Sequence, residues 1–160
     1  MQQSAPQAVS RPARSVRFES RELWTILPAL DESVADGRHL FAAWLDTLAW
    51  PTKQRDDIVL AVNEALTNAI EHAYPPGTTG ETQLYAWEVV DPERGRRRVI
   101  VVVTDHGRWK PAVVDRGHRG HGMGIMARCM DSVNVEPSPG GTAVVMTSTP
   151  VAARAERKAA

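Results

Sequence analysis

Residues 62–74 read VNEALTNAIEHAY, a stretch that combines apolar and polar residues. Its apolar residues recur at helical spacing, which predicts the second half of an amphipathic helix. Glu64 and Asn68 are four residues apart, so a helix places them on one face. A carboxylate can accept a proton from a hydroxyl, and an amide oxygen can bind a hard cation such as Mg2+. Taken alone, the pair is more simply an exposed polar stripe.

The helix that contains this stretch is the second of two neighbouring helices. Apolar residues at helical spacing predict a first helix over residues 31–50, which Pro51 ends. They predict a second helix over residues 53–74, with Thr52 as its N-cap. The run Pro75-Pro76-Gly77 ends this second helix, because the residue before a proline is biased away from helical geometry.

Alternating and β-branched segments flank the two helices and predict a sheet with one buried face. The expected strands are one or two within 15–27, then 82–90, 97–104, 132–136 and 142–148, with a loop over 105–120 and a short helix over 123–130. This order predicts an α+β fold, a two-layer α/β sandwich with helices on one face of a mainly antiparallel sheet. We expect one domain over residues 15–150, with tails at 1–14 and 151–160.

Two glycine-containing segments could complete a binding site beside the helix face. A run of valines ends in Asp105 and then Gly107, so a carboxylate that can accept from an exocyclic amine stands where a ligand can approach. Gly122-Met123-Gly124 opens a helix, where free N–H groups and the helix dipole favour an anion. Its spacing is that of neither a Walker loop nor a dinucleotide fingerprint. Alone, each segment is weak support, and Gly140-Gly141-Thr142 is more simply a hairpin turn.

The composition excludes several classes of protein. Lysine plus arginine equals aspartate plus glutamate, 19 against 19, whereas a general nucleic-acid binder usually carries a basic excess. Cys129 is the only cysteine, so the chain can form neither an internal disulfide nor a cysteine-rich metal site. No apolar run is long enough for a membrane span or a signal core. We therefore expect a cytoplasmic protein with no direct nucleic-acid partner and no membrane partner.

In their order and spacing, the four polar and glycine features resemble the GHKL ATPase superfamily. Within that superfamily, residues 63–74 are most similar to the anti-sigma-factor serine/threonine kinases of the RsbW and SpoIIAB type. The ending GGTAVVM, residues 140–146, is similar to that group as well. The resemblance covers about residues 14–149 and implies an ATP-binding sandwich of the GHKL (Bergerat) type.

The resemblance also implies a role for each matching residue. Glu64 would be the general base on a substrate hydroxyl, and Asn68 would bind the Mg2+ that bridges the ATP phosphates. Asp105 would recognise the adenine amino group, with Gly107 packed by the base. The turn formed by Gly122, Met123 and Gly124 would contact the phosphates, and Thr142 would lie near the adenine side.

By resemblance, the activity is ATP-dependent phosphorylation of a small anti-sigma-factor antagonist of the STAS type, by a protein that also sequesters a sigma factor. Family members commonly form homodimers. One residue departs from the superfamily pattern Asp-x-Gly-x-Gly, because Trp109 stands where the second glycine belongs. This departure keeps open a second hypothesis, a non-catalytic binding module of the same fold that holds a sigma factor or other regulator without transferring phosphate.

Overall fold

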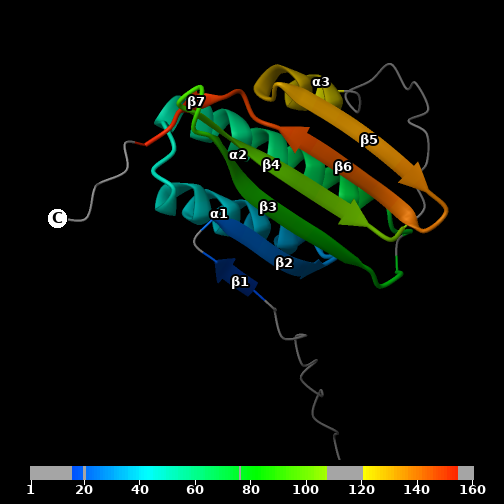
Figure 1. Ribbon diagram of the computed structural model, residues 1–160. Helices are drawn as coiled ribbons and strands as arrows, with labels where there is room; N and C mark the ends of the chain where they lie inside the picture. The colour runs from blue at the N-terminus through cyan, green and yellow to red at the C-terminus, as the bar shows by residue number, and fades with distance from the viewer. Residues whose placement is uncertain (1–15, 20, 76, 108–120, 155–160) are drawn as a thin grey trace, which may run out of the picture.

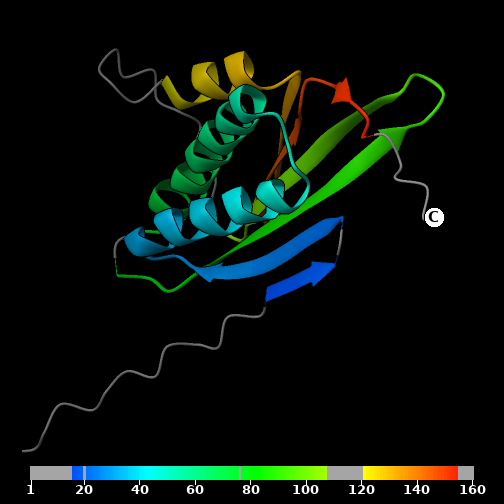
Figure 2. The same cartoon turned by 90° about the vertical axis from the view of Figure 1, so that its left-hand side faces the viewer.

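The computed structural model describes residues 16–154 except 20, 76 and 108–120. In this part of the chain, the helices form one layer and a seven-stranded sheet forms the other (Figures 1 and 2). The helices are α1 (Asp31–Thr47), α2 (Thr52–Thr67), the π-helical turn η1 (Asn68–His72) that continues α2, and α3 (His121–Cys129). None of these helices combines the length and apolarity that a membrane crossing requires. The predicted two-layer sandwich is confirmed.

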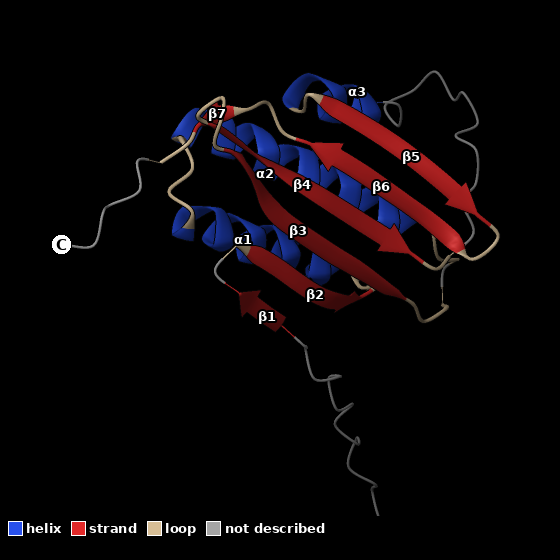
Figure 3. Ribbon diagram, viewed as in Figure 1, coloured by secondary structure: helices blue, strands red, loops and turns tan. Residues whose placement is uncertain are grey.

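The sheet is antiparallel at every pairing and has the strand order β1-β2-β3-β4-β6-β5, with β7 also paired to β4 (Figure 3). Its strands are β1 (Val16–Glu19), β2 (Glu22–Pro28), β3 (Glu81–Asp91), β4 (Arg96–Asp105), β5 (Ser132–Ser138), β6 (Gly141–Thr147) and β7 (Val151–Ala152). The segment 15–27 thus contains two strands, one of the two predicted alternatives. The strands β5 and β6 form the predicted closing hairpin.

The core lies between the two layers and is apolar. Helix α1 contributes Phe41 and Trp44, each at most 1% exposed, and their rings lie 5.6 Å apart. Alternate residues of the strands point into the same core, among them Leu84 of β3 and Val101 of β4. Burying each such side chain stabilises the fold by about 1.5–3 kcal/mol. The core therefore fixes α1 and α2 on one face of the sheet.

Two predicted helix boundaries are wrong. Helix α1 ends at Thr47 rather than near Trp50, because the Trp50 N–H bonds back to the Leu45 carbonyl and Ala49 has a φ of 46°, outside helical geometry. Thr52 is not an N-cap: Pro51 occupies that position, and no side chain caps the helix there. A proline needs no N–H partner, so it can begin a helix without a capping side chain.

The second predicted helix also changes type near its end. The α-helical pattern stops at Thr67, and Asn68–His72 forms a π-helical turn. The Thr67 hydroxyl donates to the Asn63 carbonyl, 2.9 Å away, and such back-bonding bends helices. π-helical turns are rare and often occur at functional sites. The turn begins at Asn68, one of the predicted site residues.

Two further differences concern the sheet. Asp105, predicted as the first residue of a loop, is the last residue of β4 and pairs with Thr142 of β6. The sheet also extends to Val151–Ala152, within the expected C-terminal tail, and Val151 is 7% exposed. The short β7 has no periodic pattern, because it is only two residues long. Both differences follow from strand pairing, of Asp105 with β6 and of β7 with β4, rather than from local sequence.

A buried arginine holds the end of the sheet that contains β7. Arg97 of β4 pairs with Glu88 of β3 at 3.1 Å, and both side chains are about 5% exposed. The other guanidinium N–H groups donate to the carbonyls of Leu48, Ala49 and Ala152. These bonds tie the end of α1 and strand β7 to the central strands. Within the described residues, the charge of Arg97 is therefore fully compensated.

Candidate functional site

Helix α2 positions the first two predicted residues. Its buried side packs on the core through Ile58, Val62 and Leu66, each at most 2% exposed. Glu64 and Asn68 lie off this buried side, and both side chains are partly exposed. The amide of Asn63 donates to Glu64 Oε1 at 3.4 Å, and Arg38 Nη1 of α1 donates to the Asn63 oxygen at 3.1 Å. A short chain of hydrogen bonds therefore orients the Glu64 carboxylate.

The glycine turn lies directly against this pair. A β-carbon built on Gly122 would stand 3.1 Å from Glu64 Oε2 and 3.6 Å from Asn68 Nδ2, so glycine allows the backbone of α3 to approach both side chains. Gly124, in the same helix, faces open space, and Met123 is 45% exposed. The structure thus brings Glu64, Asn68 and the first turn of α3 together in one cluster.

Asp105 forms the second cluster at the end of β4. Its carboxyl is only 6% exposed and accepts the Gly107 N–H at 3.1 Å. Burial raises the pKa of this carboxyl above its ordinary value of 3.8, while the backbone N–H groups of Gly107 and Thr142 and the charge of His106 act in the opposite direction. A buried carboxyl of this kind gains from a ligand that donates a hydrogen bond to it.

Two threonine hydroxyls flank Asp105 in the sheet. Thr82 of β3 and Thr142 of β6 are its register partners, and they are 0% and 4% exposed. Neither Oγ1 atom has a hydrogen-bond partner within the described residues. Buried polar atoms are normally paired, so these two hydroxyls suit a ligand with a polar edge. A carboxyl with two such hydroxyls fits the amino group and ring nitrogens of an adenine.

Thr82 could not be assigned to the site from the sequence alone. Thr82 is the second residue of β3, and the register with β4 places it directly opposite Asp105. Such a role becomes visible only once the β3–β4 hairpin is aligned, because the residue itself is an ordinary strand threonine. Thr142 was predicted, and the structure places it on the other side of the same carboxyl.

Tyr74 connects the two clusters and was also missed. Its hydroxyl donates to the Glu81 carbonyl at 2.6 Å and accepts the His106 N–H at 2.9 Å. A β-carbon on Gly107 would stand 2.1 Å from the Ala73 carbonyl oxygen, so the end of η1 and the Asp105 segment are in close backbone contact. The end of the helix that contains Glu64 is therefore fixed against the strand that contains Asp105.

The residues present can hold a magnesium ion only in part. Across the described ranges, no group of three or more His, Cys, Asp or Glu side chains is arranged to bind a metal. Asn68 offers one amide oxygen beside the glycine turn. Mg2+ usually keeps several waters and takes the rest of its ligands from phosphates, so one protein oxygen is consistent with a phosphate-bound ion. Trp109 and the rest of 108–120 lie outside the described residues.

Comparisons with known proteins support the fold and identify the family. Residues 27–148 match the family model of the histidine kinase-like ATPase domain. The anti-sigma F factor of Pasteuria penetrans is 32% identical over 127 aligned residues, which cover 72% of this chain and 81% of that protein. The crystal structure of the RsbU and RsbW domains of Rv1364c from Mycobacterium tuberculosis matches with a TM-score of 0.59 and 23% identity. That match covers 83% of this chain but one third, 33%, of the other, and it supports the fold alone.

Proposed function

Since this chain belongs to the histidine kinase-like ATPase (GHKL) family, in its anti-sigma-factor kinase group, we propose that it is an ATP-dependent protein serine/threonine kinase. Its substrate would be an anti-sigma-factor antagonist of the STAS type, and it would also sequester a sigma factor in the cytoplasm. Membership of the family implies ATP as the nucleotide. Mg2+, the antagonist and association of two copies of the chain are part of the proposal.

The observation that carries the proposal is the contact between Gly122 and the pair Glu64 and Asn68. It brings a carboxylate, an amide oxygen and the backbone of a helix start to one point. Phosphoryl transfer requires mainly positioning and charge neutralisation, and this set contains the kinds of groups that supply both.

Each residue has one proposed task. Glu64 accepts the proton of the substrate hydroxyl, in the orientation that Asn63 gives it. Asp105 and Thr142 hold the adenine edge, and Thr82 adds a second hydroxyl there. The other ATP-binding residues are Asn68 on the metal side, Gly107 by the base, and Gly122, Met123 and Gly124 by the phosphates. Bound Mg·ATP would supply the phosphoryl group, and Mg2+ would neutralise its charge.

A phosphate-transfer assay tests this proposal. Radiolabelled ATP and Mg2+ are incubated with the chain and a purified STAS-type antagonist, and label on the antagonist is measured. We expect transfer by the natural chain, and a loss of about 100-fold or more in Glu64→Gln, the size of a general-base effect. Glu93→Gln is the matched control, because Glu93 is exposed in the β3–β4 turn. Transfer that survives in both Glu64→Gln and Glu64→Ala would rule out Glu64 as the base.

The alternative is the non-catalytic binding module, which the sequence departure at Trp109 keeps open. Calorimetry with ATP and Mg2+ distinguishes the two functions. The kinase binds nucleotide and labels the antagonist. The binding module captures a sigma factor in a pull-down but gives neither heat with millimolar nucleotide nor label on the antagonist.

A further inference from the structure

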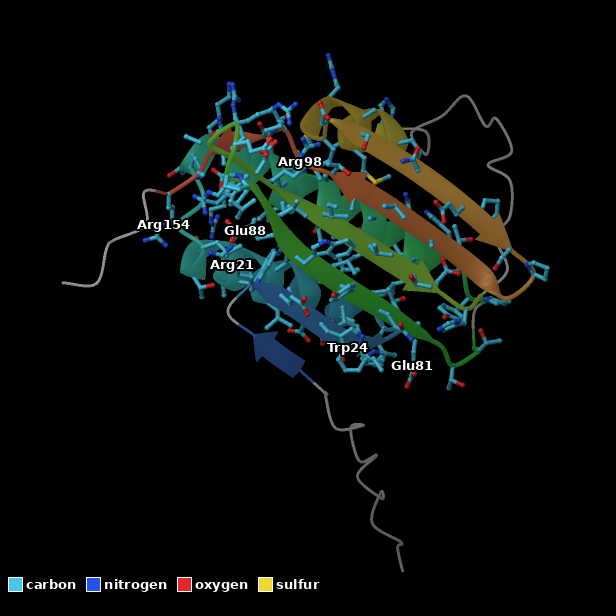
Figure 4. The ribbon with its side chains drawn as sticks, in the orientation of Figure 1. Arg21, Trp24, Glu81, Glu88, Arg98 and Arg154 are labelled. Carbon is cyan, nitrogen blue, oxygen red and sulfur yellow. The ribbon has the colours of Figure 1, made fainter. Side chains whose placement is uncertain are left out.

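The end of the sheet that lies away from Asp105 contains a pocket that is open to solvent. Its volume is about 220 Å³, and its charged lining residues are Arg21, Glu88, Arg97 and Arg154. We call it the arginine pocket. Figure 4 shows Arg21, Glu88 and Arg154 together at this end. On β4, Arg97 lies eight residues before Asp105, 97 against 105, which is ~26 Å of extended strand. The arginine pocket is therefore separate from the proposed ATP site.

The two buried charges of the arginine pocket are held in place by other protein groups. The side chains of Arg97 and Glu88 are only 5% and 6% exposed, and Arg97 Nη1 donates to Glu88 Oε1 at 3.1 Å. Arg97 Nη1 also donates to the Leu48 carbonyl at 2.8 Å. The guanidinium carbon of Arg97 lies 4.5 Å from the centroid of a Trp50 ring, the geometry of a cation–π contact. This wall of the pocket is therefore formed before any ligand binds.

The other two arginines have a fixed main chain and exposed side chains. The Glu88 N–H donates to the Arg21 carbonyl at 3.0 Å, and the Ala153 N–H, one residue before Arg154, donates to the Gly95 carbonyl at 2.8 Å. Arg21 Nε is 3.7 Å from Glu88 Oε2, which is longer than a hydrogen bond. Arg154 forms no ion pair with any described residue. The N–H groups of both guanidinium ions are therefore available to a ligand.

The charge of the arginine pocket indicates the class of its ligand. Three arginines face one glutamate, which leaves a net charge of +2. Because Arg97 and Glu88 neutralise each other, the two charges that remain are those of Arg21 and Arg154. A carboxylate carries only one negative charge, whereas a phosphate monoester carries about −1.5 to −2 at pH 7. Guanidinium groups also bind phosphate oxygens through two N–H groups at once. The charge therefore matches a phosphate monoester.

The size of the arginine pocket and its apolar residues indicate the rest of the ligand. Leu48, Val90 and Ala153 also line it, so an apolar group can be buried beside the charges. A cavity of about 150 Å³ holds benzene, so about 220 Å³ accepts a body of that size together with part of a phosphate group. Pockets for drug-sized ligands are usually larger, about 300–1,000 Å³. The ligand is therefore smaller than a nucleotide such as ATP.

We propose that the arginine pocket binds a small phosphate monoester with an apolar body. The dianionic phosphate lies between Arg21 and Arg154, and the apolar body lies against Leu48 and Val90. The ligand then contacts the end of α1, strand β3 and the segment after β7 at once. A ligand that binds only the folded chain stabilises it, so binding should raise the melting temperature. The proposal does not rest on the proposed kinase activity.

Calorimetry and thermal denaturation of the full chain test the proposal, with phenyl phosphate as the probe. We expect a dissociation constant of about 1 mM or tighter. At ten times that concentration, the melting temperature should rise by about 3–6 °C. Inorganic phosphate lacks the apolar body, and methyl phenyl phosphate carries a single negative charge. Each should bind about tenfold more weakly than phenyl phosphate, or weaker still.

Variants at the two exposed arginines test where the probe binds. Arg21→Met and Arg154→Met should each lower the affinity for phenyl phosphate about tenfold, because each removes one charged donor. Both residues are exposed, so the melting temperature without ligand should change little. Arg128→Met is the matched control, because Arg128 is exposed on α3 and does not line the arginine pocket. It should bind phenyl phosphate as the natural chain does.

Three results would overturn the proposal: no binding of phenyl phosphate up to about 10 mM, equal affinity for inorganic phosphate, or a folded double variant Arg21→Met with Arg154→Met that binds the probe normally. The affinity for ATP should be unchanged in the double variant, because the arginine pocket is at the other end of β4 from Asp105. A natural chain that binds phenyl phosphate but not ATP would support the arginine pocket and contradict the proposed kinase. The two proposals can therefore fail separately.

Discussion

Gly122 of α3 faces the Glu64 carboxylate of α2, and glycine leaves no side chain between the two. A β-carbon on Gly122 would stand 3.1 Å from the Glu64 carboxylate, whereas one on Gly124 would meet nothing within 4 Å. The two glycines of one short motif therefore do different things. The first permits contact between helices, and the second leaves space beside the cluster.

This difference predicts opposite effects on stability and on binding at Gly124. Gly124→Ala should raise the free energy of unfolding by about 0.5–1 kcal/mol, because alanine is the better helix residue. It should also weaken ATP binding about tenfold or more, because the methyl group fills the space proposed for phosphate. Urea denaturation and calorimetry measure the two effects. Unchanged affinity in a stabilised Gly124→Ala protein would place the phosphates elsewhere.

The hydrogen bonds from Arg38 to Asn63 and from Asn63 to Glu64 predict a positioning effect on the proposed transfer. Asn63→Ala should lower the transfer rate about tenfold and leave the KM for ATP unchanged, because only the orientation of Glu64 is lost. Arg38→Ala should act in the same direction with a smaller effect. Steady-state kinetics separate kcat from KM. Equal changes in both constants would mean that Asn63 contributes to nucleotide binding instead.

Asp105 predicts a pH dependence of stability. Burial raises the pKa of its carboxyl in the folded chain above the ordinary value of 3.8. Ionisation is thus easier in the unfolded chain, so the contribution of Asp105 to stability is present below pH 3.8 and is lost as the pH rises through the folded pKa. Asp105→Asn should therefore be more stable than the natural chain near neutral pH, with the difference shrinking on acidification.

Urea melts at a series of pH values from about 4 to about 7 measure this difference. The same Asp105→Asn protein should lose ATP affinity, because an amide is a weaker acceptor for an amino group than a carboxylate. Glu93→Gln, which removes an exposed carboxylate, is the control for a general effect of charge. A stability difference that grows on acidification would contradict the prediction.

Tyr74 predicts a coupled loss of stability and binding. Tyr74→Phe removes the bonds to the Glu81 carbonyl and from the His106 N–H, at a cost of about 1–2 kcal/mol in the free energy of unfolding. ATP affinity should fall severalfold as well, because Asp105 is adjacent to the released His106. Thr78→Val removes a hydroxyl bond in the same loop and should affect stability alone. A Tyr74→Phe protein that binds ATP normally would confine Tyr74 to a structural role.

The Arg97–Glu88 pair predicts a large effect on stability with no effect on the site. Arg97→Met leaves Glu88 buried without its partner and should lower the free energy of unfolding by about 3–5 kcal/mol. Arg21 also approaches Glu88, at 3.7 Å, but its side chain is 62% exposed. Arg21→Met should therefore change stability by about 1 kcal/mol or less. Thermal denaturation compares the two, and equal effects would contradict the assigned difference in burial.

Most of the fold could be predicted because the apolar residues within each helix or strand recur at the period of that element. Where a boundary depends on a contact elsewhere, the prediction was wrong or incomplete. The π-helical turn at Asn68 has the same apolar spacing as an α-helix, and β7 is too short to have a pattern. Asp105 was predicted in a loop because its pairing with Thr142 joins residues 37 positions apart, 142 against 105.

The candidate site also contains residues that the sequence could identify and residues that it could not. Glu64 and Asn68 could be found because a helix determines which face they share. Thr82 and Tyr74 could not, because the first depends on strand register and the second on hydrogen bonds to a strand and a loop. The roles of these residues in ATP binding and transfer stay predictions until the variants are measured.

Gly141 has a consequence for how selection acts on this chain. Its φ is 135°, and a β-carbon there would fall 1.9 Å from the Asp105 carbonyl oxygen. After random mutagenesis, selection for a folded chain should therefore remove nearly every substitution at position 141, although glycine has no side chain with which to contact a ligand. At Gly124 the backbone tolerates a side chain, so depletion there would report nucleotide binding. Gly141 and Gly124 could therefore be equally invariant among the selected variants for two different reasons. Gly141 would be kept because the backbone requires it, and Gly124 because ATP binding requires it.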